Sequence, residues 1–247
     1  MKHMRRNGSA AVRTVVVATI ILAGIGILRG SEQPPARRIL FIGNSLTSAN
    51  DVPGLVEALS ASGGARIDCR VVAFPNYSLE DHWNRGDAMR SILGGGWSVV
   101  VLQQGPSALP ESRTLLIDYA RRFDAAIKKV GARTALYMVW PAANRRGDFD
   151  GVSASYAAAA HAVGGLLLPV GEAWRAVLRR DPSIDLYASD GFHPTAVASY
   201  LAALVIYQKL SGRSPIGLPA TMVKPRLAEA RAALLQEAAA EVNAAKW

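Results

Sequence analysis

The feature that most constrains the fold is an alternation of short apolar runs with longer segments of helical period. Val99-Val100-Val101-Leu102 is the clearest apolar run, and such runs are typical of parallel strands covered by helices on both faces. The alternation predicts an α/β domain, a three-layer α/β/α sandwich around a mainly parallel five-stranded sheet. We expect strands at 39–43, 66–73, 98–103, 134–140 and 165–170, and helices at 52–62, 79–93, 113–130, 153–163, 196–210 and 226–245.

Length and charge narrow the class of protein. The chain has 247 residues, 50% of them hydrophobic, which is enough for one domain with a sizeable core. Its net charge is +9, but residues 1–38 hold seven basic side chains and one acidic one, so only +3 remains for the rest. Because no dense run of Lys and Arg is interleaved with aromatic residues, nucleic-acid binding is not predicted.

The N-terminal residues have the pattern of a targeting segment. A basic stretch at 2–13 precedes fifteen uncharged, mainly apolar residues at 14–28, as in a secretory signal. Fifteen residues fall short of the roughly 20 that span a bilayer, yet no clear cleavage pattern follows, so a cleaved signal and a retained membrane anchor both stay open. We predict a signal peptide or anchor at 1–30, a linker at 31–37 and a single folded domain at 38–247. The protein is then exported, to the bacterial periplasm, the cell envelope or the medium.

A serine stands where the first predicted strand ends. Ser45 lies on the turn that leaves this strand, and Gly43 is expected to give that turn its backbone freedom. In open α/β sheets ligands bind at the carboxyl ends of the strands, so an exposed serine there is a candidate nucleophile. Capping of the next helix is the alternative role. A serine hydroxyl also needs a base that takes its proton.

His193 is the strongest candidate for this base. In the loop Asp190-Gly191-Phe192-His193-Pro194 a carboxylate stands three residues before the histidine. Asp190 would hold the imidazole through Nδ1 and leave Nε2 facing Ser45. His82 follows the second strand and is predicted to line the substrate cleft. The other two histidines fall in the targeting segment and in an Ala-rich helix.

These two motifs carry a family resemblance. GNSL at 43–46 resembles the first conserved block of the SGNH (GDSL-like) hydrolases, and DGFHP at 190–194 resembles their last. The similarity extends over about 39–218, with softer matches to exported bacterial branches at 77–83, 169–174 and 186–187. The resemblance implies a flavodoxin-like fold and a serine esterase that works through an acyl-enzyme, with Ser45, Asp190 and His193 as the triad.

Two departures from the family pattern fall on the oxyanion hole. The second block normally offers a glycine N–H, but residues 73–77 contain no glycine. We predict Asn76 as the substitute, because asparagine tolerates left-handed backbone geometry. The third block normally reads G-x-N, whereas Ser107 stands in the asparagine place. The amide of Gln103 or Gln104 is predicted to join the Ser45 N–H as a donor; the alternative is that both glutamines hydrogen-bond the loop.

The substrate is less constrained than the chemistry. No metal-binding or nucleotide-binding spacing occurs, so we predict no metal and no cofactor. Export, with Trp83, Trp140 and Trp174 available for sugar stacking, favours a small ester or an O-acylated carbohydrate, although the tryptophans also suit the core. Two alternatives stay open: a lipid or thioester acyl hydrolase, and a non-catalytic envelope binding protein whose oxyanion hole has decayed.

Overall fold

A five-stranded parallel sheet forms the centre of the molecule, in a computed structural model that describes Met1 and residues 35–247. The strand order is β2-β1-β3-β4-β5. The strands are β1 (Arg37–Gly43), β2 (Ile67–Ala73), β3 (Val99–Leu102), β4 (Arg133–Tyr137) and β5 (Leu166–Leu168). The predicted α/β class is therefore confirmed. Because the chain runs from β1 to β2 on one side and returns to β3 on the other, ligand-binding loops are expected at the carboxyl ends of β1 and β3.

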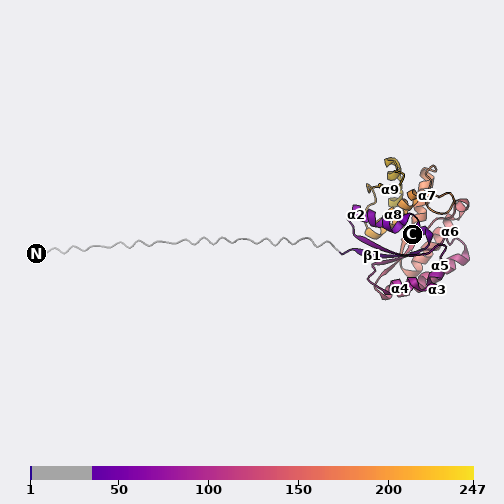
Figure 1. Cartoon of the computed structure of the whole chain (residues 1–247), viewed down its shortest axis with the longest axis horizontal. Helices are drawn as coiled ribbons and strands as arrows, with labels where there is room; N and C mark the ends of the chain where they lie inside the picture. The colour runs from indigo at the N-terminus through magenta and orange to yellow at the C-terminus, as the bar shows by residue number, and fades with distance from the viewer. Residues whose placement is uncertain (2–34) are drawn as a thin grey trace. The chain divides into compact units, whose positions relative to one another are not determined.

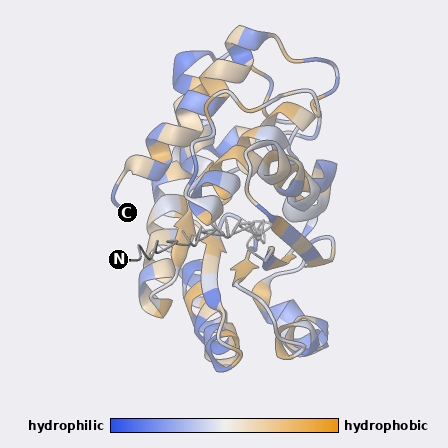
Figure 2. Ribbon diagram, turned by 90° about the vertical axis from the view of Figure 1, so that its left-hand side faces the viewer, coloured by the Kyte–Doolittle hydropathy of each residue, from blue (hydrophilic) through white to orange (hydrophobic). Residues whose placement is uncertain are grey.

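Helices cover both faces of this sheet (Figure 1). On one face lie α2 (Val52–Ser62), α7 (Val170–Arg180), α8 (Ala196–Ser211) and α9 (Glu229–Ala244). On the other lie α3 (Leu79–Arg85), α4 (Asp87–Leu93), α5 (Pro110–Lys129) and α6 (Phe149–Val163). The helices carry hydrophilic residues on part of their surface and apolar residues on the rest (Figure 2). This division follows from packing one face of each helix on the sheet.

The central strands β1 and β3 are continuously apolar because both of their faces are buried under helices. Residues 39–42 of β1 and 99–102 of β3 are at most 1% exposed. Their register pairs Ile42 with Leu102, and β1 also pairs Gly43 with Ala73 of β2. The three strands therefore end at the same level. The loops that leave them meet at one edge of the sheet.

Some predicted boundaries are wrong. The helix expected at 79–93 is two helices, because Gly86 adopts a left-handed conformation (φ +84°) between α3 and α4. The strand expected at 165–170 ends at Leu168, and α7, which was not predicted, begins at Val170 directly after Pro169. Three short helices were also not predicted: α1 (Ser45–Ser48), η1 (Ala49–Asp51) and η2 (Ala143–Asp148).

The N-terminal predictions fall mainly outside the described residues. β1 begins at Arg37, so the last residue of the predicted linker belongs to the sheet and pairs with Ile67. The predicted signal or anchor at 1–30 lies, apart from Met1, outside the residues that the structure describes. Over the described part of the chain, none of the helices combines the length and the apolar character that a membrane span requires.

Candidate active site

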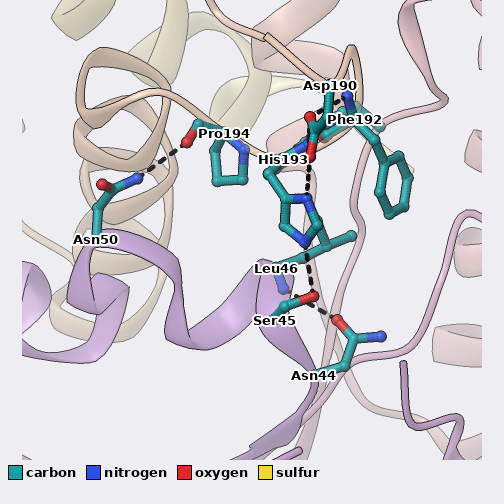
Figure 3. Close-up of polar contacts among 9 residues, drawn as sticks. Asn44, Ser45, Leu46, Asn50, Asp190, Phe192, His193 and Pro194 are labelled. Carbon is teal, nitrogen blue, oxygen red and sulfur yellow. Dashed lines mark hydrogen bonds and ion pairs between the residues drawn. The ribbon is translucent and has the colours of Figure 1, made fainter. Parts of the chain in front are cut away.

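A hydroxyl, an imidazole and a carboxylate lie in one hydrogen-bonded row at the carboxyl end of β1 (Figure 3). Ser45 is the first residue of α1 and follows β1 after one intervening residue, Asn44. Its Oγ lies 2.9 Å from His193 Nε2, and His193 Nδ1 lies 2.5 Å from Asp190 Oδ2. In this order the imidazole can take the hydroxyl proton while the carboxylate stabilises the imidazolium that results.

The Asp190 carboxylate is fixed by its own loop. Its Oδ1 accepts the backbone N–H groups of Phe192 and His193, each at 2.9 Å. The Phe192 N–H, then the His193 ring and backbone, lower the pKa of Asp190 to about 2. The carboxylate therefore stays ionised at any working pH, although its side chain is half exposed. On the other side of the loop, Trp140 Nε1 donates to the Phe192 carbonyl at 3.0 Å.

Asn50 ties the histidine loop to the serine segment, a role that the sequence analysis missed. Its Nδ2 donates to the Pro194 carbonyl and to Ser199 Oγ, both at 3.0 Å; the first bond is drawn in Figure 3. Asn50 itself has a left-handed backbone (φ +51°), which asparagine adopts more readily than most residues. An asparagine shortly after the serine was the only sequence signal of this contact.

A buried amide network sets the position of the serine turn. Gln103 Oε1 accepts the Asn44 N–H at 2.8 Å and the Thr47 hydroxyl at 2.7 Å, while Gln103 Nε2 donates to Asn44 Oδ1 at 3.0 Å. Asn44 Nδ2 in turn donates to the Tyr77 carbonyl at 3.0 Å. The loops after β1, β2 and β3 are thus joined through one asparagine and one glutamine.

Gly43 is required here for close approach and not for backbone freedom, which corrects our expectation. A Cβ on Gly43 would lie 2.4 Å from both Gln103 Oε1 and Thr47 Oγ1. Gly43 has no positive φ. Any larger residue would therefore push the glutamine away from the serine turn.

The structure contradicts the oxyanion role predicted for Gln103, and it places Gln104 in the alternative role, bonded to the loops. Gln103 is 1% exposed and Gln104 is 5% exposed. Gln103 Nε2 is bonded to Asn44 and to the Gln104 carbonyl, and Gln104 Nε2 donates to Ser107 Oγ at 2.8 Å. Gln104 Oε1 accepts the Leu79 N–H at 3.1 Å. Both N–H groups of Gln103 Nε2 are therefore used inside the loops, and Gln104 is held there through its Nε2 and its Oε1.

Two backbone N–H groups remain at the site. Asn76 has the left-handed backbone that we expected (φ +63°) and is exposed in the loop after β2. Among the described residues, neither the Asn76 N–H nor the Ser45 N–H has a hydrogen-bond acceptor. Ser107, in the family's asparagine place, donates its hydroxyl to the Gly105 carbonyl at 3.1 Å. Ser45 and Asn76 are therefore the candidates for binding an oxyanion.

His82 does not line a substrate cleft, contrary to our prediction. Its side chain is fully buried, and Nε2 donates to the Gly43 carbonyl at 2.7 Å. Burial lowers the pKa of this imidazole, so it stays neutral. His82 therefore holds the backbone carbonyl of Gly43, where the chain enters the serine turn.

Two of the three tryptophans considered for sugar stacking are buried in the core instead. Trp140 and Trp174 are fully buried and stack on each other, with ring centroids 3.8 Å apart. Trp83 on α3 is half-buried and contacts Phe123 of α5 edge-on. Trp140 and Trp174 therefore belong to the core, the alternative that the sequence left open, and Trp83 packs against it.

A cleft opens beside the histidine loop, between the loops that leave β3 and β4. It has a volume of about 260 Å³. Its apolar lining comes from Pro106, Ala108, Leu109, Pro141, Ala142 and Phe192. The Ala143 N–H donates to the Gly191 carbonyl at 2.8 Å, which joins the β4 loop to the histidine loop. Over the described residues, no group of three or more His, Cys, Asp or Glu side chains is placed to hold a metal ion.

Comparisons with known proteins identify a family through solved structures. No family model matches the sequence, and no curated protein matches it. Among solved structures, a protein from Slackia heliotrinireducens described as an SGNH hydrolase is 30% identical, with a TM-score of 0.61, over 71% of this chain and 100% of its own.

Two further structures support the fold alone, because their identities are low. A DUF4886 family protein from Bacteroides uniformis is 18% identical with a TM-score of 0.72, over 85% of this chain and 95% of its own. A lipase/acylhydrolase from Enterococcus faecalis is 17% identical with a TM-score of 0.57, over 72% of this chain and 98% of its own.

Proposed function

This chain belongs to the SGNH hydrolase family, and from that premise we propose that it hydrolyses small acyl esters with Ser45 as nucleophile, His193 as base and Asp190 as the orienting carboxylate. As a member of this family it is a serine ester hydrolase. The observation that carries the residue assignment is the row of two hydrogen bonds from Ser45 Oγ through His193 to Asp190. A serine that only capped α1 would not need this row, and the cap of α1 is in fact Asn44.

Acylation follows from this row. Ser45 Oγ attacks the carbonyl carbon of the ester while His193 Nε2 takes the hydroxyl proton. The carbonyl oxygen becomes an oxyanion, which the N–H groups of Ser45 and Asn76 bind. The bond from the carbonyl carbon to the alcohol oxygen then breaks, His193 gives the proton to the leaving alcohol, and the acyl group stays on Ser45.

Deacylation repeats the same steps with water. His193 takes a proton from a water molecule, whose oxygen attacks the acyl carbon. The second tetrahedral intermediate collapses, the bond to Ser45 Oγ breaks, and His193 returns the proton to the serine. The carboxylic acid leaves. Asp190, ionised throughout because of its low pKa, holds the imidazole in one orientation during both halves.

The substrate that we propose is an O-acetylated carbohydrate, with a short acyl group. The buried Trp140 and Trp174 do not support this choice, but the cleft beside Phe192 does, because polar groups line it together with apolar ones. Four polar side chains line the cleft: Ser107, Ser112, Arg145 and Asp148. The last two form an ion pair. Such a lining is unfavourable for a long alkyl chain, since the chain would cover polar groups without bonding them.

We also propose that the protein is exported, on the strength of the basic and apolar segments at the N-terminus. A chain shortened to begin at Ser31 should fold and keep its esterase activity, because β1 begins only at Arg37. Circular dichroism and hydrolysis of p-nitrophenyl acetate would check both. A shortened chain that fails to fold would show that residues before 31 belong to the domain.

A substrate panel tests the proposed function. Purified protein should hydrolyse p-nitrophenyl acetate and lose efficiency as the acyl group lengthens to octanoyl. A fatty acyl thioester should be a poor substrate. Preference for long acyl chains or thioesters would favour the lipid or thioester alternative instead. A folded protein without activity on any of these esters would favour the non-catalytic binding protein.

A further inference from the structure

The cleft beside Phe192 contains a charged pair that the proposed chemistry does not use. Arg145 Nη2 lies 2.7 Å from Asp148 Oδ2, on η2 in the loop after β4. Both side chains line the cleft, and they are partly exposed, at 53% and 32%. An exposed pair of this kind adds only about 0–1 kcal/mol to stability. Its position in the cleft therefore calls for another explanation.

The pair is neutral as a unit but still offers hydrogen bonds. The guanidinium keeps N–H donors that Asp148 does not occupy, and the carboxylate keeps a second acceptor oxygen. A ligand group that carries a full charge gains little from a neutral pair. Adjacent hydroxyl groups, which donate and accept at once, match it.

The rest of the cleft suits a compact ring. Its volume of about 260 Å³ lies below the roughly 300–1,000 Å³ of pockets for drug-sized ligands. Phe192 provides an aromatic surface at one side, with Pro106 and Pro141 among the other apolar residues. The apolar C–H face of a pyranose packs on such surfaces while its hydroxyl groups stay free for polar partners.

The cleft also adjoins the side of the site where the alcohol leaves. His193 must hand its proton to the leaving oxygen, and Phe192 is the residue next to it in the loop. The oxyanion donors, Ser45 and Asn76, belong to the loops after β1 and β2, whereas the cleft lies between the loops after β3 and β4. An ester bound with its carbonyl oxygen toward Asn76 can thus direct its alcohol portion toward Phe192.

We infer that the cleft is a subsite for one uncharged sugar ring on the alcohol side of the ester, with Phe192 under the ring and the Arg145–Asp148 pair on two adjacent hydroxyls. This inference rests on the proposed esterase function. It names two residues, Arg145 and Asp148, as determinants of specificity that act by binding the leaving group.

Two acetate esters of primary alcohols test this subsite. Methyl 6-O-acetyl-glucopyranoside carries the ring, and ethyl acetate carries the same acyl group on an alcohol too small to fill the cleft. Acetate release should give a higher kcat/KM for the sugar ester in the wild type. Arg145→Met and Asp148→Ala should each lower the ratio of the two kcat/KM values by about tenfold, which corresponds to about 1.4 kcal/mol.

Arg146→Met is the matched control, because Arg146 is exposed on the same short helix but lies over the Tyr187 ring and does not line the cleft. Its ratio should equal that of the wild type. A wild-type ratio near one, or an Arg145→Met change shared by Arg146→Met, would overturn the subsite. A change in acyl-length preference in Arg145→Met would assign the cleft to the acyl group instead. Absence of activity on both esters would count against the esterase itself.

Discussion

The two sides of the site are built differently. On the histidine side, Asp190 and His193 come from one short loop, hydrogen-bond each other and are partly exposed. On the opposite side, Gln103 and Asn44 are buried and bond only to other parts of the protein. The comparison separates two tasks. The exposed loop carries the imidazole proposed to exchange protons and the carboxylate that orients it, whereas the buried amides fix the position of the serine.

The largest expected effects come from the hydrogen-bonded row of Ser45, His193 and Asp190. Ser45→Ala and His193→Ala should each lower kcat on p-nitrophenyl acetate by roughly three orders of magnitude or more, because members of such a row act as a unit. Asp190→Asn should cost less, since nucleophile and base remain in place. Steady-state kinetics on folded variants would measure this. Near-normal turnover in His193→Ala would refute the assignment of the base.

The buried side should respond in a different way. Gln103→Leu removes the acceptor of the Asn44 N–H and the Thr47 hydroxyl, and unsatisfied buried groups cost about 1–3 kcal/mol in the free energy of unfolding. Because the serine turn loses its anchor, kcat should also fall, by about tenfold. Urea unfolding and kinetics would give both values.

Gln104→Leu is the control for this effect. Gln104 is equally buried but bonds to Leu79 and Ser107, not to the serine turn. It should lose a similar free energy of unfolding and little of kcat. Equal losses of kcat in the two variants would mean that Gln103 only stabilises the fold.

Substitutions of Asn76 test whether its backbone N–H or its side-chain amide binds the oxyanion. If its backbone N–H binds the oxyanion, Asn76→Gly should keep kcat within a few fold, because glycine adopts positive φ freely. Asn76→Ala should lower it further, since a left-handed conformation costs most residues about 1–2 kcal/mol. A loss of about a hundredfold or more in Asn76→Gly would instead assign the role to the side-chain amide.

The smallest expected effect is on stability at mildly acid pH. Burial lowers the pKa of His82 from its usual 6.5, so below about pH 6.5 the unfolded chain binds a proton that the folded chain does not. The free energy of unfolding should therefore fall as pH drops from 7.5 to 5. His82→Gln should lose less over this range, whereas His161→Gln, at an exposed position of α6, should follow the wild type. Parallel curves for His82→Gln and the wild type would contradict this account.

The sequence predicts the fold well because the fold depends on patterns that are local. Continuous apolar runs such as 99–102 mark buried parallel strands, and the helix 52–62 was predicted to its exact ends. The prediction from sequence fails at α7, because the buried apolar stretch around Pro169 is compatible with a strand or a helix. Apolar periodicity does not separate the two over so few residues.

In the candidate site, too, residues in short motifs could be predicted, whereas residues fixed by distant partners could not. Ser45, His193 and Asp190 stand in short motifs, so the sequence could single them out, and their catalytic role stays a prediction. The directions of the Gln103 and Gln104 amides depend on partners up to 59 residues away. Nor could the burial of His82 and Trp174 be predicted from the local sequence, because both lie in helices, α3 and α7, whose buried face is set by tertiary packing.

Labelling by a fluorophosphonate tests the central claim most directly, since this probe reacts only with an activated serine. Mass spectrometry of the labelled wild type should find one adduct, on Ser45. Labelling should be lost in Ser45→Ala, strongly slowed in His193→Ala and retained in Ser189→Ala, where an exposed serine next to Asp190 is removed. A folded wild type that takes up no probe, or an adduct that persists in Ser45→Ala, would contradict the account.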